Sequence, residues 1–475
     1  MNSPTPLEPA QPGGALPVDP RPRSTASATR GGEQLSSERP GDGGSSLPLT
    51  NLLEHCAAAV RAVRSGVSLN EALLRCPAPL RPGTQALSFH ALRWLGAALT
   101  VRALLVRRAP PPEVDALLLC AITLLWPDAP ARYAEHTLVD QAVGAARRIA
   151  PHSAAFVNAT LRRFLRERTS VRAAALRDPQ ALHNHPAWWI DRLAHDWPRE
   201  APAILHAANE HPPMDLRVNA RRSSPENYLA RLAENGIAAH RGAGAWITLS
   251  QPCPVTRLPG FEQGDVSVQD AAAQLAAPLL LGSGLLPGAR VLDACAAPGG
   301  KTAHLLELAD LDLTALDRDA ARLQRVEQTL RRLGLHAKTM HADAGDPSSW
   351  WDGRPFDAVL LDAPCSASGI VRRHPDIRWL RRSRDIDALA AIQAELLEAL
   401  WPLLKPGGRL VYATCSVFKN EGQTQVDVFL QRHSEAKLAQ CPPATGHLLP
   451  LPENQGIRTD PAAYDGFFYA LLVKT

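Results

Sequence analysis

Paired cysteines are missing from this sequence. None of its 8 cysteines stands in a C-x-x-C pair, and they are spread from residue 56 to residue 441. A zinc ribbon needs such pairs and a disulfide scaffold needs a dense cysteine framework, so the spacing argues against both. Dispersed cysteines suit a reducing compartment. We therefore expect a cytoplasmic protein that holds no metal.

Long apolar runs are missing as well. No uninterrupted run reaches the roughly 18 residues that cross a bilayer, and the best candidate, residues 275–286, is broken by a proline and two glycines. The first 46 residues are rich in Pro, Gly and Ser and lack the apolar segment of a secretory signal. We expect residues 1–46 to be a disordered tail and the protein to have no membrane partner.

A strong excess of one charge is also absent, since 51 Lys and Arg stand against 47 Asp and Glu. An excess this weak does not by itself indicate nucleic-acid binding; the basic residues would have to cluster.

The chain contains enough residues, 475, for several domains. From residue 47 to residue 168, apolar residues recur at three- and four-residue spacing, as in EVDALLLCAITLLW at 113–126, which predicts an all-α domain. A short α+β segment follows, with strands expected at 214–218 and 246–249 and a helix from Ser224 to Glu234.

From about residue 287 the pattern alternates between strands and helices. Strands are expected at 290–294, 313–317, 356–361, 409–413 and 467–473, and helices at 302–308, 319–333 and 386–404. Such alternation is typical of a doubly wound, mainly parallel sheet, in which ligands bind beyond the carboxyl ends of the strands.

Polar and reactive residues come directly after these strands. They are the glycine-rich stretch 295–301, Asp317, the segment Asp362–Cys365 and the segment Thr414–Ser416, and Asp343, in the region HADAGD between the second and third of these strands, is counted with them. Their arrival at one edge of a sheet is difficult to explain as packing.

The stretch CAAPGGKT at 295–302 resembles a phosphate-binding loop, but Cys295 stands where the first glycine is required. Asp317, at the end of the second strand, is placed to accept hydrogen bonds from ribose hydroxyls. Together with Asp343 and Asp362 it would repel a triphosphate and suit a positively charged ligand, such as the sulfonium of S-adenosylmethionine. A magnesium-bound nucleotide is the alternative.

Cys365 and Cys415 end two expected strands, in Pro-Cys and Thr-Cys-Ser contexts. A thiolate that adds to carbon 6 of a cytosine makes carbon 5 nucleophilic enough to attack a methyl group. That chemistry also needs an acid near N3, for which Asp362 is available, and a second group to assist release. Two ordinary buried cysteines are the alternative.

Several motifs together are similar to those of the RNA cytosine-5 methyltransferases. They are CAAPGGKT, LDAPCSASG, RRHPDIRW, KPGGRLVYATCS and DGFFYA. LVDQAVGAARR and FVNATLRRFLR resemble the NusB-type RNA-binding domain, and PMDLRVN and GDVSVQDAAAQ resemble the segment that precedes the catalytic core. The combination resembles the branch of the family that modifies small-subunit ribosomal RNA.

The resemblance implies a multidomain chain. After the tail come an all-α NusB-like domain over 47–185, a small α+β linker domain over 186–272 and a Rossmann-like class I methyltransferase domain over 273–475. It implies an enzyme that uses S-adenosylmethionine to methylate carbon 5 of a cytosine in 16S ribosomal RNA, either naked or in early assembly intermediates. A monomer is the default expectation, since the sequence does not give the oligomeric state. The alternatives are another RNA substrate, such as transfer RNA, or a non-catalytic binding protein.

The resemblance also implies residue roles. Cys415 would be the nucleophile, Cys365 would assist release, and Asp362 would contact the base, whereas spacing alone does not decide between the two cysteines. Asp317 would bind the ribose and Asp343 would lie near the adenine. The implied cofactor loop consists of Cys295, Ala296, Ala297, Pro298, Gly299, Gly300 and Lys301. Lys301 is expected to orient the site.

One departure follows the nucleophile: Glu421 is retained, but Gly422 replaces the residue expected there, which puts a contact at the start of a helix in doubt.

Two basic clusters are candidates for RNA contact. Arg162 and Arg163 lie in one expected helix, and Arg372, Arg373 and Arg378 surround Trp379 beside the Pro-Cys loop. Basic groups with an aromatic suit an RNA backbone and an unstacked base. The alternative, above all for the first cluster, is a solvated charged face.

Overall fold

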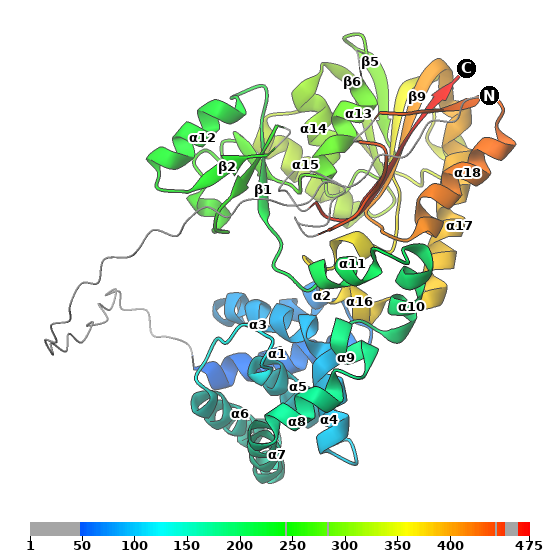
Figure 1. Ribbon diagram of the computed structural model, residues 1–475. Helices are drawn as coiled ribbons and strands as arrows, with labels where there is room; N and C mark the ends of the chain where they lie inside the picture. The colour runs from blue at the N-terminus through cyan, green and yellow to red at the C-terminus, as the bar shows by residue number, and fades with distance from the viewer. Residues whose placement is uncertain (1–47, 243–244, 283–284, 442–443, 452–463) are drawn as a thin grey trace, which may run out of the picture. The chain divides into compact units, whose positions relative to one another are not determined.

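The computed structural model describes residues 48–242, 245–282, 285–441, 444–451 and 464–475, and the predicted tail, 1–46, lies outside the described residues. The described chain runs from a group of helices through a small sheet to a larger sheet (Figure 1).

The helical group packs around α5, in which every residue from Val114 to Leu125 is buried. A helix this apolar on all sides must lie inside other helices. The group consists of α1 (Leu49–Arg64), α2 (Leu69–Leu74), α3 (Arg81–Arg93), α4 (Leu95–Leu105), α5 (Pro112–Leu125), α6 (Glu135–Ile149), α7 (Ala154–Arg166), α8 (Arg168–Ala175) and α9 (Pro179–His183). The expected all-α region is confirmed, and within it α3 and α4 follow each other with Trp94 between them.

A small antiparallel sheet follows α10 (Ala187–Asp196) and α11 (Ala201–Ala207). Its strand order is β2-β3-β1-β4, and α12 (Pro225–Glu234) begins at Ser224, whose side chain accepts a hydrogen bond from Asn227 N. The strands are β1 (Met214–Val218), β2 (Ala239–Arg241), β3 (Trp246–Leu249) and β4 (Val266–Val268). The sequence predicted β1 and β3 but missed β2 and β4, because three residues are too few to show an alternating pattern.

The larger sheet has the order β10-β12-β9-β8-β5-β6-β7, and β11 pairs with β12. Its central pairs, from β9 through β8, β5 and β6 to β7, are parallel, whereas β12 runs antiparallel to β9. The strands are β5 (Ala289–Asp293), β6 (Leu311–Asp317), β7 (Lys338–His341), β8 (Phe356–Asp362), β9 (Leu404–Thr414), β10 (Ala436–Ala439), β11 (Gly446–Leu448) and β12 (Phe467–Lys474).

Helices cover both faces of this sheet. Val291 packs among α13 (Ala276–Leu281), α14 (Gly300–Leu308) and α15 (Ala320–Leu333), and the next residue, Leu292, packs on the other side with α17 (Ser383–Leu400) and α18 (Gln423–Arg432). Successive side chains of a strand point to opposite faces. The result is the doubly wound, Rossmann-like arrangement that the sequence predicted.

A short helix, α16 (Ile377–Leu380), joins the larger sheet to the helical group (Figure 1). The indole of Trp379 donates to the carbonyl of Leu92 at 2.7 Å, and the carboxylate of Asp376 accepts from Leu69 N at 3.0 Å. The segment around α16 is therefore an internal contact between two parts of the chain.

Candidate active site at the carboxyl edge of the sheet

The loop from Cys295 to Lys301 connects β5 to α14. Gly299 has φ +95°, and a Cβ at this position would lie 3.0 Å from the Cα of Val326 in α15, so the loop needs glycine here. Asp317, at the end of β6, holds the loop: its carboxylate accepts from Ala297 N at 3.1 Å and from Asp319 N at 2.9 Å.

Lys301 is bound to Asp362 at the end of β8, with a distance of 2.6 Å between Nζ and Oδ2. Burial lowers the pKa of Lys301, but the charge and the hydrogen bond of Asp362, together with the neighbouring acidic groups, raise this pKa above its usual value. An ammonium held by a carboxylate is not available to bind phosphates, so this geometry argues against the phosphate-binding-loop alternative. The ion pair with Lys301 also orients the carboxylate of Asp362.

Carboxylates dominate this edge of the sheet. Burial, followed by the charges of Asp362, Asp293 and Asp317, raises the pKa of the Cys295 thiol, and burial raises the pKa of Asp293 to about 7. Asp343 lies just beyond β7 at the same edge and is exposed, with its carboxylate accepting from Gly345 N at 2.8 Å. An acidic edge fits a sulfonium group better than a phosphate.

The two cysteines at the ends of β8 and β9 are in contact, and their Sγ atoms are 3.4 Å apart. The hydrogen bond to Cys415 and burial raise the pKa of the Cys365 thiol well above its usual value. Cys365 therefore keeps its proton at neutral pH and can donate it in a hydrogen bond to the sulfur of Cys415.

Glu421 joins the two cysteine loops, a role that its retention in the motif did not reveal. Its buried carboxylate accepts from the backbone N of Ser366 at 2.7 Å and from the hydroxyl of Ser416 at 2.6 Å. Ser366 follows Cys365 directly, and Ser416 follows Cys415 directly. One carboxylate thus fixes the distance between the two sulfurs.

Replacing Glu421 with glutamine is expected to lower kcat by about 10- to 100-fold, because a shift of about 1 Å at a reacting group can cost that much. The substrate assay described below measures kcat, and calorimetry should show unchanged cofactor binding. Glu398→Gln, in the exposed part of α17, is the control. Equal kcat values for the two variants would contradict this role for Glu421.

Gly422 is explained by its neighbours. A Cβ there would lie 2.6 Å from Cε1 of His447 and 2.8 Å from Cγ of Phe468. No side chain of residue 422 caps α18; instead the backbone N of Gln423 donates to Nε2 of His447 at 3.5 Å. With glycine at position 422, the start of α18 therefore has the contact between Gln423 N and His447 in place of one from a side chain of residue 422.

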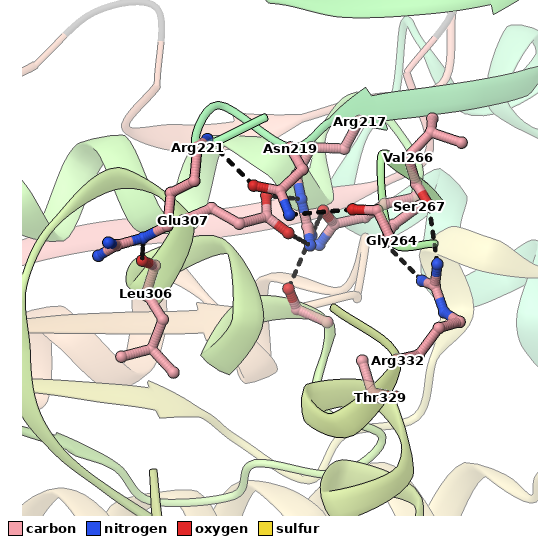
Figure 2. A network of polar contacts seen from close by, with 12 residues as sticks. Arg217, Asn219, Arg221, Gly264, Val266, Ser267, Leu306, Glu307, Thr329 and Arg332 are labelled. Atoms are coloured by element: carbon pink, nitrogen blue, oxygen red, sulfur yellow. Dashed lines mark hydrogen bonds and ion pairs between the residues drawn. The ribbon is translucent and has the colours of Figure 1, made fainter. Parts of the chain in front are cut away.

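The small sheet is joined to the loop and to α14 by a network of polar contacts around Arg217 (Figure 2). Arg217 in β1 donates to the carbonyl of Gly300 at 2.7 Å and makes a two-pronged ion pair with Glu307 of α14, with both distances 2.8 Å. Both side chains are buried. The sequence did not single out Arg217, because Glu307 and Gly300 lie more than 80 residues away from it.

The prediction that Arg372, Arg373 and Arg378 contact RNA needs correction. Arg378 is 0 % exposed and donates to the carbonyl of Ala208 at 2.6 Å, and Arg372 is also buried. Arg372 and Arg373 both bind the buried carboxylate of Asp465. The fold brings acceptors that are distant in sequence against these arginines, so their side chains point into the protein and not toward the solvent.

The first basic cluster lies on α7. Arg162 donates to Asn158 at 2.9 Å, and Arg163 pairs with Glu167 at 3.0 Å. Both remain at least partly accessible at the surface, and their contact with RNA stays a prediction.

Among the residues that the structure describes, no helix is long and apolar enough to cross a membrane. Within the same residues, no three His, Cys, Asp or Glu side chains are grouped so that they could hold a metal ion.

Known proteins match most of the chain. The family model for "16S rRNA methyltransferase RsmB/F" matches residues 285–473, and that for the RsmF/B-like ferredoxin-like domain matches residues 185–256. Ribosomal RNA small subunit methyltransferase B of Pseudomonas putida is 44% identical over 88% of this chain and 97% of its own. The protein of that name from Xanthomonas campestris pv. campestris is 47% identical over 82% and 88%. The crystal structure of PH0851 is similar with a TM-score of 0.70 at 27% identity, over 90% of this chain and 99% of that one.

Proposed function

This chain belongs to the family of the ribosomal RNA small subunit methyltransferases B, and from that membership we propose that it methylates carbon 5 of a cytosine in 16S ribosomal RNA. S-adenosylmethionine supplies the methyl group. The contact of 3.4 Å between the sulfurs of Cys365 and Cys415 is the observation that carries the cytosine-5 chemistry.

In this proposal Cys415, as a thiolate, adds to carbon 6 of a cytosine that has left its stack. Carbon 5 then becomes enamine-like and takes the methyl group. Asp362, oriented by Lys301, contacts the base near N3. A water molecule takes the proton on carbon 5, the electrons of that bond re-form the double bond between carbons 5 and 6, and the bond between sulfur and carbon 6 breaks. The S–H of Cys365 stabilises the departing thiolate of Cys415 by a hydrogen bond.

The residues at the sheet edge fit the cofactor. Asp317 would bind the ribose hydroxyls with the lone pairs that the loop amides leave open, and Asp343 would lie near the adenine. The remainder of the loop, from Cys295 to Lys301, brings backbone close to the nucleoside. The acidic surroundings of Cys295 favour the positive sulfonium.

The helical group is proposed to be a NusB-like RNA-binding domain, with the boundaries 47–185 that the sequence predicts. We further propose a monomer that acts on naked 16S RNA or on early assembly intermediates, and Arg162 and Arg163 as RNA contacts on α7.

The test supplies S-adenosylmethionine with a labelled methyl group to the full-length protein, together with naked 16S RNA, assembled small subunits and transfer RNA. We expect 5-methylcytosine at one site of the naked 16S RNA. Label in transfer RNA alone would overturn the substrate, and label on a position other than carbon 5 would overturn the chemistry.

A further inference from the structure

A cleft of about 630 Å³ lies between the helical group and α11, away from the carboxyl edge of the sheet. Its lining includes His90, Arg93 and Trp94 from α3 and the turn that follows it, and Asn184 and Asn209 from the connections after α9 and α11.

Two buried arginines, Arg93 in the lining of the cleft and Arg378 next to it, have no acidic partner among the described residues. Arg93 is 3 % exposed, donates to the carbonyl of Arg372 at 2.7 Å, and has no partner for its Nε. Arg378 donates only to uncharged oxygens, those of Asn184, Ala208 and Asn209. Among the described residues, no carboxylate lies within ion-pair distance of either guanidinium. Burying a charge without a counter-charge is costly.

Other charges around the cleft do not cancel these two. Asp128 is bound by two nitrogens of Arg172 at 2.8 to 3.0 Å, and Glu210 lies 3.5 Å from His206. Arg132 is exposed and close enough to Arg93 to lower its pKa, after burial, to about 10. With Arg172 and Asp128 paired, Arg93 in the lining and the nearby Arg378 and Arg132 outnumber the one remaining carboxylate, Glu210, and an anion would compensate this positive excess.

We infer that this cleft binds a phosphate of the substrate RNA, with Arg93 in its lining as the cationic contact and the charge of the nearby Arg132 in support. The inference rests on the proposed RNA substrate and adds a second point of attachment outside the catalytic edge. The volume accommodates a nucleotide, and the half-buried ring of Trp94 offers an aromatic face to a base or ribose.

The cleft is connected to the catalytic cysteines through one segment of chain. Arg93 holds the carbonyl of Arg372, and further along the same segment Arg381 donates to the carbonyls of Ser366 at 3.1 Å and Cys365 at 3.3 Å. RNA held in the cleft would thus contact a part of the protein that is tied to the catalytic loop.

The test measures the Kd of full-length protein for naked 16S RNA by filter binding at several salt concentrations. Arg132→Gln, an exposed change that should leave the fold intact, is expected to raise Kd about 3- to 10-fold and to reduce the salt slope by about 1. Arg75→Gln removes an equal charge from an arginine whose side chain is 71% exposed, and is the control.

Arg93→Gln is expected to weaken RNA binding more, provided that circular dichroism shows it folded; otherwise the Arg132 comparison decides alone. Equal effects of Arg132→Gln and Arg75→Gln would overturn the inference. The inference would also be overturned if Arg132→Gln weakened the binding of inorganic phosphate but left the Kd for RNA unchanged. The measurement needs no methyl transfer, so absence of 5-methylcytosine would contradict the proposed reaction and leave this result standing.

Discussion

A Cys415→Ala protein is expected to lose methyl transfer to 16S RNA by at least about 10³-fold, because in the proposed reaction Cys415 is the group that adds to carbon 6 of the base. A Cys365→Ala protein is expected to behave differently. It can still form the bond between Cys415 and carbon 6, but it lacks the S–H group 3.4 Å away that stabilises the departing thiolate. It should therefore accumulate protein joined to RNA.

A denaturing gel after incubation with 16S RNA and cofactor measures the adduct, and label incorporation measures the transfer. Cys253→Ala changes a partly buried cysteine near the small sheet and is the control. An adduct formed by Cys415→Ala, and not by Cys365→Ala, would reverse the two roles.

Glu307→Gln is expected to lower the free energy of unfolding by about 3 kcal/mol, because it leaves the buried charge of Arg217 without its partner (Figure 2). Since Arg217 also holds the carbonyl of Gly300, cofactor binding should weaken as well. Urea unfolding measures the first effect, and calorimetric titration with S-adenosylmethionine measures the second.

Asp310→Asn is the matched control, because it breaks an exposed ion pair with Arg221 between the same two parts of the chain. An exposed pair contributes about 1 kcal/mol or less. If both variants unfolded at the same urea concentration, the buried pair would not hold the small sheet to the cofactor loop.

Local patterns made much of the fold predictable. β5, β6, β8, β9 and β12 have five or more residues each and are rich in apolar side chains, and turn signals bound them. The strands that were missed, such as β7 and β10, have four residues or fewer and lie toward the edges of the sheet. Short edge strands depend on their neighbours for hydrogen bonds, so their own sequence carries little of the signal.

The candidate site, too, was predictable from the sequence only in part. The order of the motifs along an alternating chain was enough to place Cys365, Cys415, Asp317 and Asp362 at one edge, because parallel strands all end there. The distance between the two sulfurs was not in the sequence. It depends on Glu421, whose carboxylate reaches back 55 residues to the loop of Cys365.

The sequence by itself determined the class of fold, the edge at which the reactive groups meet and the family motifs, since all three follow from short-range order along the chain. Only the tertiary structure decided which charges face the solvent. Arg372 and Arg373 looked accessible until the fold brought Asp465, more than 90 residues away, against both of them. Arg93, inside an apolar stretch, became part of a charged cleft. Whether a charged side chain is buried or exposed depends on its hydrogen-bond and ion-pair partners, and the fold determines where those partners lie.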